Sequence, residues 1–268
     1  MRKLLGVIVM LMPMLAFAQQ SGISGTWKID LNKVQMDSKA RVYELKDGMF
    51  SCSTCDPKVS MMADGKEHKV AGSPYFDMAS VTVVDPSTVE MTGTKDGKLA
   101  FRITSTVSPD GKTLTRKYEG HPAGSSEVST DTSILSRVGE PEMGAHAVSG
   151  SWKVEKFESA SENWLTFTYA STGDGLKYKA STGENYDAKF DGKDHPYQGD
   201  PGTTSVVLKK IDDNTFEETD KRDGEVIGVS RMTLSPDSKA LTIVTEDKRR
   251  GVTDTWVAER QENQEAEK

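Results

Sequence analysis

The residues with the most reactive side chains in this sequence are two cysteines, Cys52 and Cys55, with two residues between them. A pair at this spacing can form a local disulfide, cycle in thiol–disulfide exchange, or contribute to a zinc or copper site. A redox pair requires its first thiolate at a helix N-terminus, and Asp56-Pro57 after a strand-like segment does not provide one. A metal ion would require a second pair of soft ligands nearby. We therefore expect a structural disulfide and no metal site, and we keep a redox role as an alternative.

The histidines and carboxylates predict no catalytic machinery. His68 and His195 each follow an Asp-Gly turn at equivalent places in two halves of the chain, which is typical of a shared turn residue, while His121 and His146 fall in loop-like segments. The 41 Asp and Glu residues suit a secreted surface, and no two of them stand out as an acid and a base. Hydrolase, metalloprotease, phosphate-binding and dinucleotide-binding motifs are absent from the sequence. We expect a non-enzymatic protein with no catalytic residue and no cofactor.

The first 18 residues have the pattern of a secretory signal peptide. Arg2 and Lys3 precede an apolar run from Leu4 to Leu15, and Ala16-Phe17-Ala18 forms a small-x-small cleavage site. The apolar run is shorter than the roughly 20 residues of a membrane-spanning helix, and Pro13 interrupts it. This predicts a bacterial protein of the periplasm or the exterior, with no membrane insertion after the signal is removed.

Composition and charge exclude several partners. Hydrophobic residues make up 35% of the 268-residue chain and charged residues 28%, as in a soluble globular protein. Removal of residues 1–18 takes away the two positive charges of Arg2 and Lys3, so the formal net charge changes from −7 to −9. An acidic protein is repelled by nucleic acid and by anionic lipid, so we expect neither as a partner, and the sequence identifies no protein partner.

An internal repeat divides the remaining chain into two halves. Five landmarks recur in the same order, 123 to 127 residues apart. The matched pairs are Ser24–Lys28 with Ser149–Lys153, Asp64–His68 with Asp191–His195, Lys95–Lys98 with Arg222–Glu225, Thr106–Asp110 with Thr233–Asp237, and Asp131, Thr132 and Arg137 with Asp254, Thr255 and Arg260. The period is too long for a solenoid unit, so each copy is expected to be a domain. The predicted boundaries are 19–138 and 149–260, with a linker at 139–148 and a polar tail at 261–268.

Each copy is expected to be an antiparallel β-meander. Leu99, Phe101 and Ile103 alternate with polar residues, as do Leu241-Thr242-Ile243, and this period of two is typical of strands. Asp-Gly dipeptides, which suit tight hairpin turns, recur about every 10 residues. About eight or nine such strands per copy can close an up-and-down barrel and so leave no exposed sheet edge. The fold class is therefore predicted to be all-β, with two tandem antiparallel up-and-down barrels.

Each copy begins with a Gly-x-Trp strand and ends with a strand that carries an arginine. We expect Trp27 to lie under Arg137 and Trp152 under Arg260, each pair closing one end of a barrel by cation–π stacking. This arrangement resembles the lipocalin and fatty-acid-binding group, in which an arginine from a late strand covers the tryptophan of the first. The ordered segments around Ser24–Lys28, Asp64–Lys66 and Ser108–Thr115 also look like those of exported bacterial proteins of unassigned function.

The architecture suggests a function without fixing it. Tyr75 and Phe76 in the first copy and Tyr197 in the second lie near the repeated turn, where they would line a barrel mouth that admits a small hydrophobic ligand. The preferred hypothesis is therefore an exported, lipocalin-like binding protein. Two alternatives stay open: a structural or interaction module of the cell envelope with filled barrels, and a redox protein that uses Cys52 and Cys55.

Overall fold

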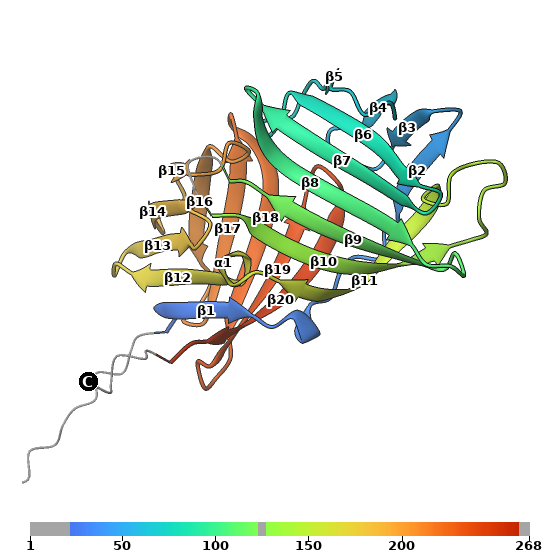
Figure 1. Cartoon of the computed structure of the whole chain (residues 1–268). Helices are drawn as coiled ribbons and strands as arrows, with labels where there is room; N and C mark the ends of the chain where they lie inside the picture. Colours follow the sequence, from blue (N-terminus) through green and yellow to red (C-terminus); the bar gives the residue numbers. More distant parts are fainter. Residues whose placement is uncertain (1–21, 123–126, 263–268) are drawn as a thin grey trace, which may run out of the picture.

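The computed structural model describes residues 22–122 and 127–262, and these residues form two ten-stranded antiparallel sheets (Figure 1). Strands account for 59% of the structure and helices for 3%, so the predicted all-β class with two up-and-down barrels is confirmed. The predicted signal peptide at 1–18 lies outside the described residues, as does most of the tail at 261–268.

The first sheet, here called the N-barrel, has the strand order β4-β3-β2-β11-β10-β9-β8-β7-β6-β5. Its two end strands are not paired with each other, but Asp64 forms an isolated bridge with Thr82 across the gap. Its strands are β2 (Arg41–Lys46), β3 (Met49–Cys52), β4 (Val59–Met62), β5 (His68–Lys69), β6 (Met78–Asp85), β7 (Thr88–Lys95), β8 (Lys98–Val107), β9 (Thr113–Gly120), β10 (Ser129–Val138) and β11 (Gly150–Ala160).

The second sheet, here called the C-barrel, is closed, because β1 pairs with both β12 and β20. Its strands are β1 (Gly25–Ile29), β12 (Thr166–Ser171), β13 (Gly175–Ala180), β14 (Asn185–Lys189), β15 (His195–Gln198), β16 (Ser205–Lys210), β17 (Thr215–Arg222), β18 (Glu225–Leu234), β19 (Ala240–Asp247) and β20 (Val252–Arg260). Each barrel has ten strands, whereas eight or nine were expected. The expected number was too low because short strands such as β5 and β15 show too little alternation to be recognised in the sequence.

The two barrels have exchanged their first strands. In Figure 1, the blue strand β1 lies among the yellow-to-red strands of the second repeat, away from the blue β2, and β11 lies beside β10. In register, Trp27 is opposite Phe167 and Arg260, while Trp152 is opposite Arg137 and Arg41. The predicted domain boundaries at 19–138 and 149–260 are therefore wrong, since each barrel takes nine strands from one repeat and one from the other.

The segment at 139–148 is not a linker between barrels. It joins β10 to β11 as a hairpin connection within the N-barrel, where the amide of His146 donates to the Leu45 carbonyl at 2.9 Å. The chain passes between barrels instead through the segment after β1, which contains the short helix η1 (Leu31–Lys33), and through the single helical turn α1 (Glu162–Leu165). A local hairpin closes a short loop, which costs less chain entropy than pairing β10 with the distant β1.

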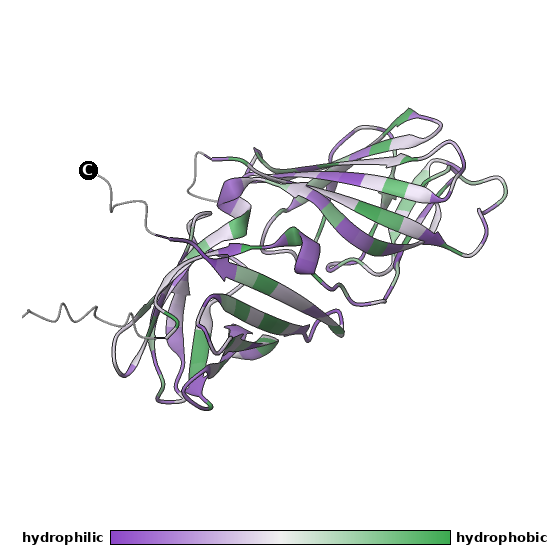
Figure 2. Cartoon of the chain, turned by 90° about the horizontal axis from the view of Figure 1, so that it is seen from below, coloured by the Kyte–Doolittle hydropathy of each residue, from purple (hydrophilic) through white to green (hydrophobic). Residues whose placement is uncertain are grey.

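The tightest turns support the meander as expected. At Asp47-Gly48, Asp96-Gly97 and Asp223-Gly224 both residues have positive φ, the conformation of a two-residue hairpin turn. Figure 2 shows the two barrels next to each other, with apolar and polar positions alternating along their strands. Inward-facing side chains form a separate hydrophobic core in each barrel. Trp152 belongs to the N-barrel core and Trp27 to the C-barrel core, and both are 0% exposed. The exchanged strands are therefore integral to the barrels that receive them.

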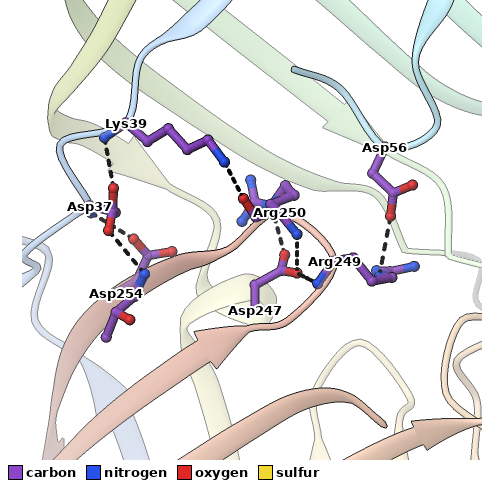
Figure 3. Close-up of polar contacts among 8 residues, drawn as sticks. Asp37, Lys39, Asp56, Asp247, Arg249, Arg250 and Asp254 are labelled. Atoms are coloured by element: carbon purple, nitrogen blue, oxygen red, sulfur yellow. Dashed lines mark hydrogen bonds and ion pairs between the residues drawn. The ribbon is translucent and has the colours of Figure 1, made fainter. Parts of the chain in front are cut away.

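Polar contacts hold the first crossing segment in place (Figure 3). The Asp254 carboxylate accepts from the amide of Asp37 at 2.8 Å, and the Asp37 carboxylate accepts from the amide of Thr253 at 3.1 Å. Arg249, in the β19–β20 loop, pairs with Asp56 of the N-barrel at 3.2 Å. These contacts fasten the segment after β1 to β20 and connect the β19–β20 loop to the neighbouring barrel.

Aromatic side chains fasten the second crossing segment. Trp164, in α1, lies 5.6 Å from Phe157 of β11 and 5.9 Å from Trp256 of β20, measured between ring centroids. Phe157 and Trp256 are themselves 5.8 Å apart, so one ring from each barrel meets the ring of the crossing turn. Packing of this kind fixes how the two barrels face each other.

Candidate functional site

An arginine closes one end of each barrel by stacking on a buried tryptophan. The Arg137 guanidinium carbon lies 4.1 Å from the Trp152 ring centroid, and that of Arg260 lies 4.3 Å from the Trp27 ring centroid. The four residues predicted for closure thus meet, but the predicted partners are wrong. The sequence suggested pairs within each repeat, whereas the strand exchange places each arginine on the tryptophan of the other repeat.

Hydrogen bonds hold each arginine in place. Arg137 donates to the carbonyls of Gly111, Ala147 and Ser149 at 2.6 to 2.7 Å. Arg260 donates in the same way to Gly22, Ser24 and Ser238. Each of the three guanidinium nitrogens thus donates to one carbonyl, which holds the guanidinium in place at the end of the barrel.

The glycine of each Gly-x-Trp motif makes room for the clamp. A Cβ at Gly25 would lie 2.4 Å from the Arg260 Nη1, and one at Gly150 would lie 2.5 Å from the Arg137 Nη1. Both glycines also have positive φ, +144° and +127°, which other residues rarely adopt.

At their opposite ends the two barrels share a cavity of about 1240 Å³. The C-barrel supplies most of its inner wall, and strand ends and loops at one end of the N-barrel supply its rim. The wall residues used below are Phe167, Tyr169, Tyr178, Tyr197, Glu218 and Met232; the rim residues are Tyr75, Lys95, Lys98, Tyr118 and His121. Because Arg260 seals the far end, the C-barrel forms a pocket that opens toward the N-barrel.

A row of tyrosines crosses four neighbouring strands of the C-barrel. Tyr169 is paired in register with Tyr178, Tyr178 with Tyr186, and Tyr186 with Tyr197. The ring centroids of these successive pairs are 5.3, 5.3 and 5.8 Å apart. Directly paired positions share one face of a sheet, so the register itself builds this row. Phe167 extends it on β12, 5.7 Å from Tyr169.

Two carboxylic acids face the same interior from β17. Glu218 and Asp220 are two residues apart, so both point to the same side as the buried Phe216. The Tyr186 hydroxyl donates a hydrogen bond to Glu218. The Oδ1 atom of Asp220 is buried and has no hydrogen-bond partner among the described residues.

The environment favours the protonated form of this acid pair. Burial raises the pKa of Glu218, and the negative charge of Asp220 raises it further. Burial also raises the pKa of Asp220, while the hydrogen bond with Glu218 opposes that rise. Two adjacent carboxyl groups in a poorly solvated site titrate as one unit, so the pair retains a proton well above the pH at which exposed carboxyl groups lose theirs.

Sequence reasoning identified two wall or rim residues and missed the acid pair. Tyr75 and Tyr197 line the cavity, and Tyr75 is 42% exposed. Phe76 does not line it: the ring is 9% exposed and packs edge-on against Phe101 in the N-barrel core at 5.0 Å. The sequence signal for Glu218 and Asp220 is their spacing from Phe216. Every second residue from Phe216 onward faces the interior, and in β17 these positions hold acids where apolar residues are expected.

The equivalent interior of the N-barrel is different. Arg41, opposite Trp152, takes the register place that Phe167 has opposite Trp27. The Arg116 guanidinium carbon lies 5.5 Å from the Tyr118 ring centroid, and burial together with the nearby charge of Arg41 lowers the pKa of Arg116. The tyrosine-lined acidic pocket is thus a property of one barrel only.

The predicted disulfide between Cys52 and Cys55 is confirmed, and it lies in the N-barrel. Cys52 is paired in register with Tyr43, and at the equivalent place in the C-barrel Tyr178 is paired with Tyr169. The first cysteine of the disulfide therefore takes the position that a tyrosine of the row has in the C-barrel. His68 and His195 contact Asp64 and Asp191, respectively, at 2.8 and 2.9 Å in the same turn geometry.

Three further findings concern metal binding, membrane-spanning helices and similarity to known proteins. In residues 22–122 and 127–262, no cluster of three or more His, Cys, Asp and Glu side chains is placed to hold a metal ion. Within the same described ranges, none of the helices has the length and apolar character that crossing a membrane requires. No protein family, curated protein or solved structure matches the chain.

Proposed function

We propose that this protein binds one small molecule with an apolar, preferably aromatic, body in the C-barrel cavity, and that it is an exported binding protein rather than an enzyme. The observation that carries the proposal is the cavity of about 1240 Å³, which is lined by Tyr169, Tyr178 and Tyr197 of the row and closed at its far end by Arg260. Ligand pockets usually combine an apolar or aromatic wall with a few polar groups that orient the ligand, as this wall does.

The size of the cavity fits this role. Pockets for small molecules typically enclose about 300–1,000 Å³. The larger value here includes the space between the C-barrel mouth and the N-barrel rim. A planar ring that enters from this side would stack on Tyr178 or Tyr197 in offset or edge-on geometry. The likeness to lipocalin-like barrels supports the same function.

The N-barrel is assigned a supporting role in this proposal. Its residue Phe101 packs against Phe76 and reaches the cavity from the N-barrel side, and its rim residue Tyr75 lines the cavity together with Asp200 of the C-barrel. Gly202 leaves room for Tyr75, since a Cβ there would lie 1.9 Å from the Tyr75 hydroxyl. The N-barrel would thus shape the mouth of the pocket without holding the ligand itself.

The experiment that tests this proposal compares equivalent positions of the two barrels. N-phenyl-1-naphthylamine, a neutral aromatic dye that fluoresces in apolar surroundings, is titrated into the wild-type protein and into Tyr169→Leu and Tyr43→Leu. Tyr169 lines the cavity and Tyr43 does not. We expect Tyr169→Leu to weaken dye binding at least about ten-fold and Tyr43→Leu to leave it unchanged. Equal effects of the two substitutions, or no dye binding by the wild-type protein, would overturn the proposal.

A further inference from the structure

We propose that the ligand of the C-barrel carries a positive charge, as a protonated amine or a quaternary ammonium group, which lies between the tyrosine row and the carboxyl groups of Glu218 and Asp220. This inference rests on the proposed function, because it assigns a chemical class to the occupant of the same cavity.

The acid pair has no cationic partner in residues 22–122 and 127–262. No lysine, arginine or histidine in the described part of the chain forms an ion pair with Glu218 or Asp220. Their polar contacts are the hydrogen bond from Tyr186 and the interaction with each other. The buried Asp220 Oδ1 has no partner at all among these residues. Burial of a carboxylate is costly unless the charge is paired, so an ammonium group in the cavity would supply the missing charge.

The tyrosine row provides the second half of a cation site. The face of an aromatic ring carries negative potential and attracts a cation within about 6 Å of its centroid, and cages of such rings bind quaternary ammonium groups. Tyr178 lines the cavity at the centre of the row, between Tyr169 and Tyr186. Burial raises the pKa of the Tyr178 hydroxyl, and the nearby acidic residues Glu218, Glu184, Asp220 and Asp200 raise it further, as expected where acidic groups surround a ring.

The cations near the cavity do not cancel this potential. Lys95, Lys98 and His121 lie on the rim contributed by the N-barrel. Lys95 is 3.9 Å from the Asp77 carboxylate and His121 is 2.9 Å from that of Glu119, so two of these three groups already have acidic partners. The buried Arg116 and its neighbour Arg41 belong to the other barrel. A cationic ligand would therefore meet Glu218 in the wall of the pocket, with Asp220 beside it on β17 and no cation paired to either.

The test uses probes that differ in charge but little in shape. Benzyltrimethylammonium and neopentylbenzene have the same size, and only the first is charged; benzenesulfonate is the anionic counterpart. Each displaces bound N-phenyl-1-naphthylamine from the full-length mature protein. We expect benzyltrimethylammonium to compete at least about ten-fold more strongly than neopentylbenzene, and benzenesulfonate to compete least.

Two variants locate the source of the preference. Glu218→Gln with Asp220→Asn removes the charge and keeps the shape of both side chains. Glu217→Gln is the matched control, because Glu217 lies on the opposite face of β17. The double variant should lose the preference for the cation but still bind the neutral dye, which also establishes that its cavity is folded. Glu217→Gln should retain the preference.

The outcomes separate this inference from the proposed function. Equal or stronger competition by neopentylbenzene overturns the cation assignment while dye binding still supports a pocket for neutral molecules. A cation preference that survives in the double variant overturns the role of the acid pair. Failure of the wild-type protein to bind the dye or any of the three probes contradicts both proposals. If the double variant does not fold, Asp220→Asn alone replaces it in the test. This single variant should still bind the dye but show a weaker preference for benzyltrimethylammonium over neopentylbenzene.

Discussion

Trp27 lies under the guanidinium of Arg260, in the other repeat, and not under Arg137 of its own. This relationship shows that neither repeat is a complete barrel. Each barrel depends on a strand that reaches it from the other half of the chain, and the two crossing segments hold the barrels mouth to mouth around the shared cavity. The exchange therefore positions the candidate site as well as completing the sheets.

The exchange makes a prediction about which barrel each tryptophan stabilises. Trp27→Ala should lower the free energy of unfolding by about 3–5 kcal/mol, as for other fully buried tryptophans. In hydrogen–deuterium exchange, protection should be lost mainly in β12 and β20, which flank β1.

Trp152→Ala provides the reciprocal control. It should reduce protection in β10 and β2 and leave the C-barrel strands largely protected. If each substitution instead loosened the strands of its own repeat, the exchanged topology would be incorrect.

The acid pair predicts an unusual dependence of stability on pH. Burial and the neighbouring Asp220 raise the pKa of Glu218 to about 8, above the ordinary glutamate value, so its folded-state pKa exceeds its unfolded-state pKa. Stability from this group is fully present below the unfolded-state pKa and is lost as the pH rises toward 8.

We expect Glu218→Gln to remove part of this loss. A pKa shift changes the free energy of unfolding by at most about 1.4 kcal/mol per pKa unit, and the Glu218 side chain keeps some access to the cavity, which reduces this value. We therefore expect the substitution to reduce the loss of stability between pH 5 and pH 8.5 by roughly 1–2 kcal/mol. Urea denaturation at the two pH values measures the difference. Glu217→Gln is the control, and an equal pH dependence in both variants would rule out the buried pair as its source.

The first-strand glycines predict a specific loss of stability. Gly25→Ala places a Cβ against the Arg260 guanidinium and forces an alanine into positive φ, so it should destabilise the protein by more than the about 1–3 kcal/mol of backbone strain alone. Gly139→Ala is the matched control, because Gly139 also has positive φ but a Cβ there meets no other atom within 4 Å. Thermal or urea unfolding should rank Gly25→Ala as the less stable variant; the opposite order would argue against the clamp.

The disulfide is expected to stabilise the N-barrel without affecting the pocket. Cys52 and Cys55 close a very short loop, so replacing both with serine should lower the free energy of unfolding by only about 1–2 kcal/mol. Dye binding in the C-barrel should be unchanged. Mass spectrometry of the unreduced protein should detect no free thiol, and a loss of dye binding in the double serine variant would link the disulfide to the site.

Some of this structure could be predicted from the sequence because local patterns determine it. Alternation such as Leu99, Phe101 and Ile103 identifies strands, and Asp-Gly pairs such as Asp96-Gly97 identify their turns. The repeat then implies two barrels. The spacing of Cys52 and Cys55 was enough to expect a disulfide, since the alternatives needed a helix or further ligands nearby.

The strand exchange could not be predicted, because the sequence motifs are equally compatible with tryptophan–arginine pairs within a repeat and between repeats. Trp27 and Trp152 lie in nearly identical motifs, and so do Arg137 and Arg260, so either tryptophan fits under either arginine. The choice depends on how the crossing segments pack, for example at Asp37 and Asp254, and no local pattern encodes those contacts.

The candidate site was hidden for a related reason. Tyr169, Tyr178, Tyr186 and Tyr197 are separated along the chain, and only the register of four strands brings them into one row. Among 41 acidic residues, Glu218 and Asp220 are distinguished by their inward register alone.

The most direct test of binding in the C-barrel is a crystal structure of the mature protein grown with benzyltrimethylammonium. The account predicts density for one molecule inside the C-barrel, with its ammonium group within about 6 Å of the Tyr178 ring centroid and close to the Glu218 carboxyl group. A C-barrel filled only by solvent, or a ligand bound in the N-barrel instead, would contradict it.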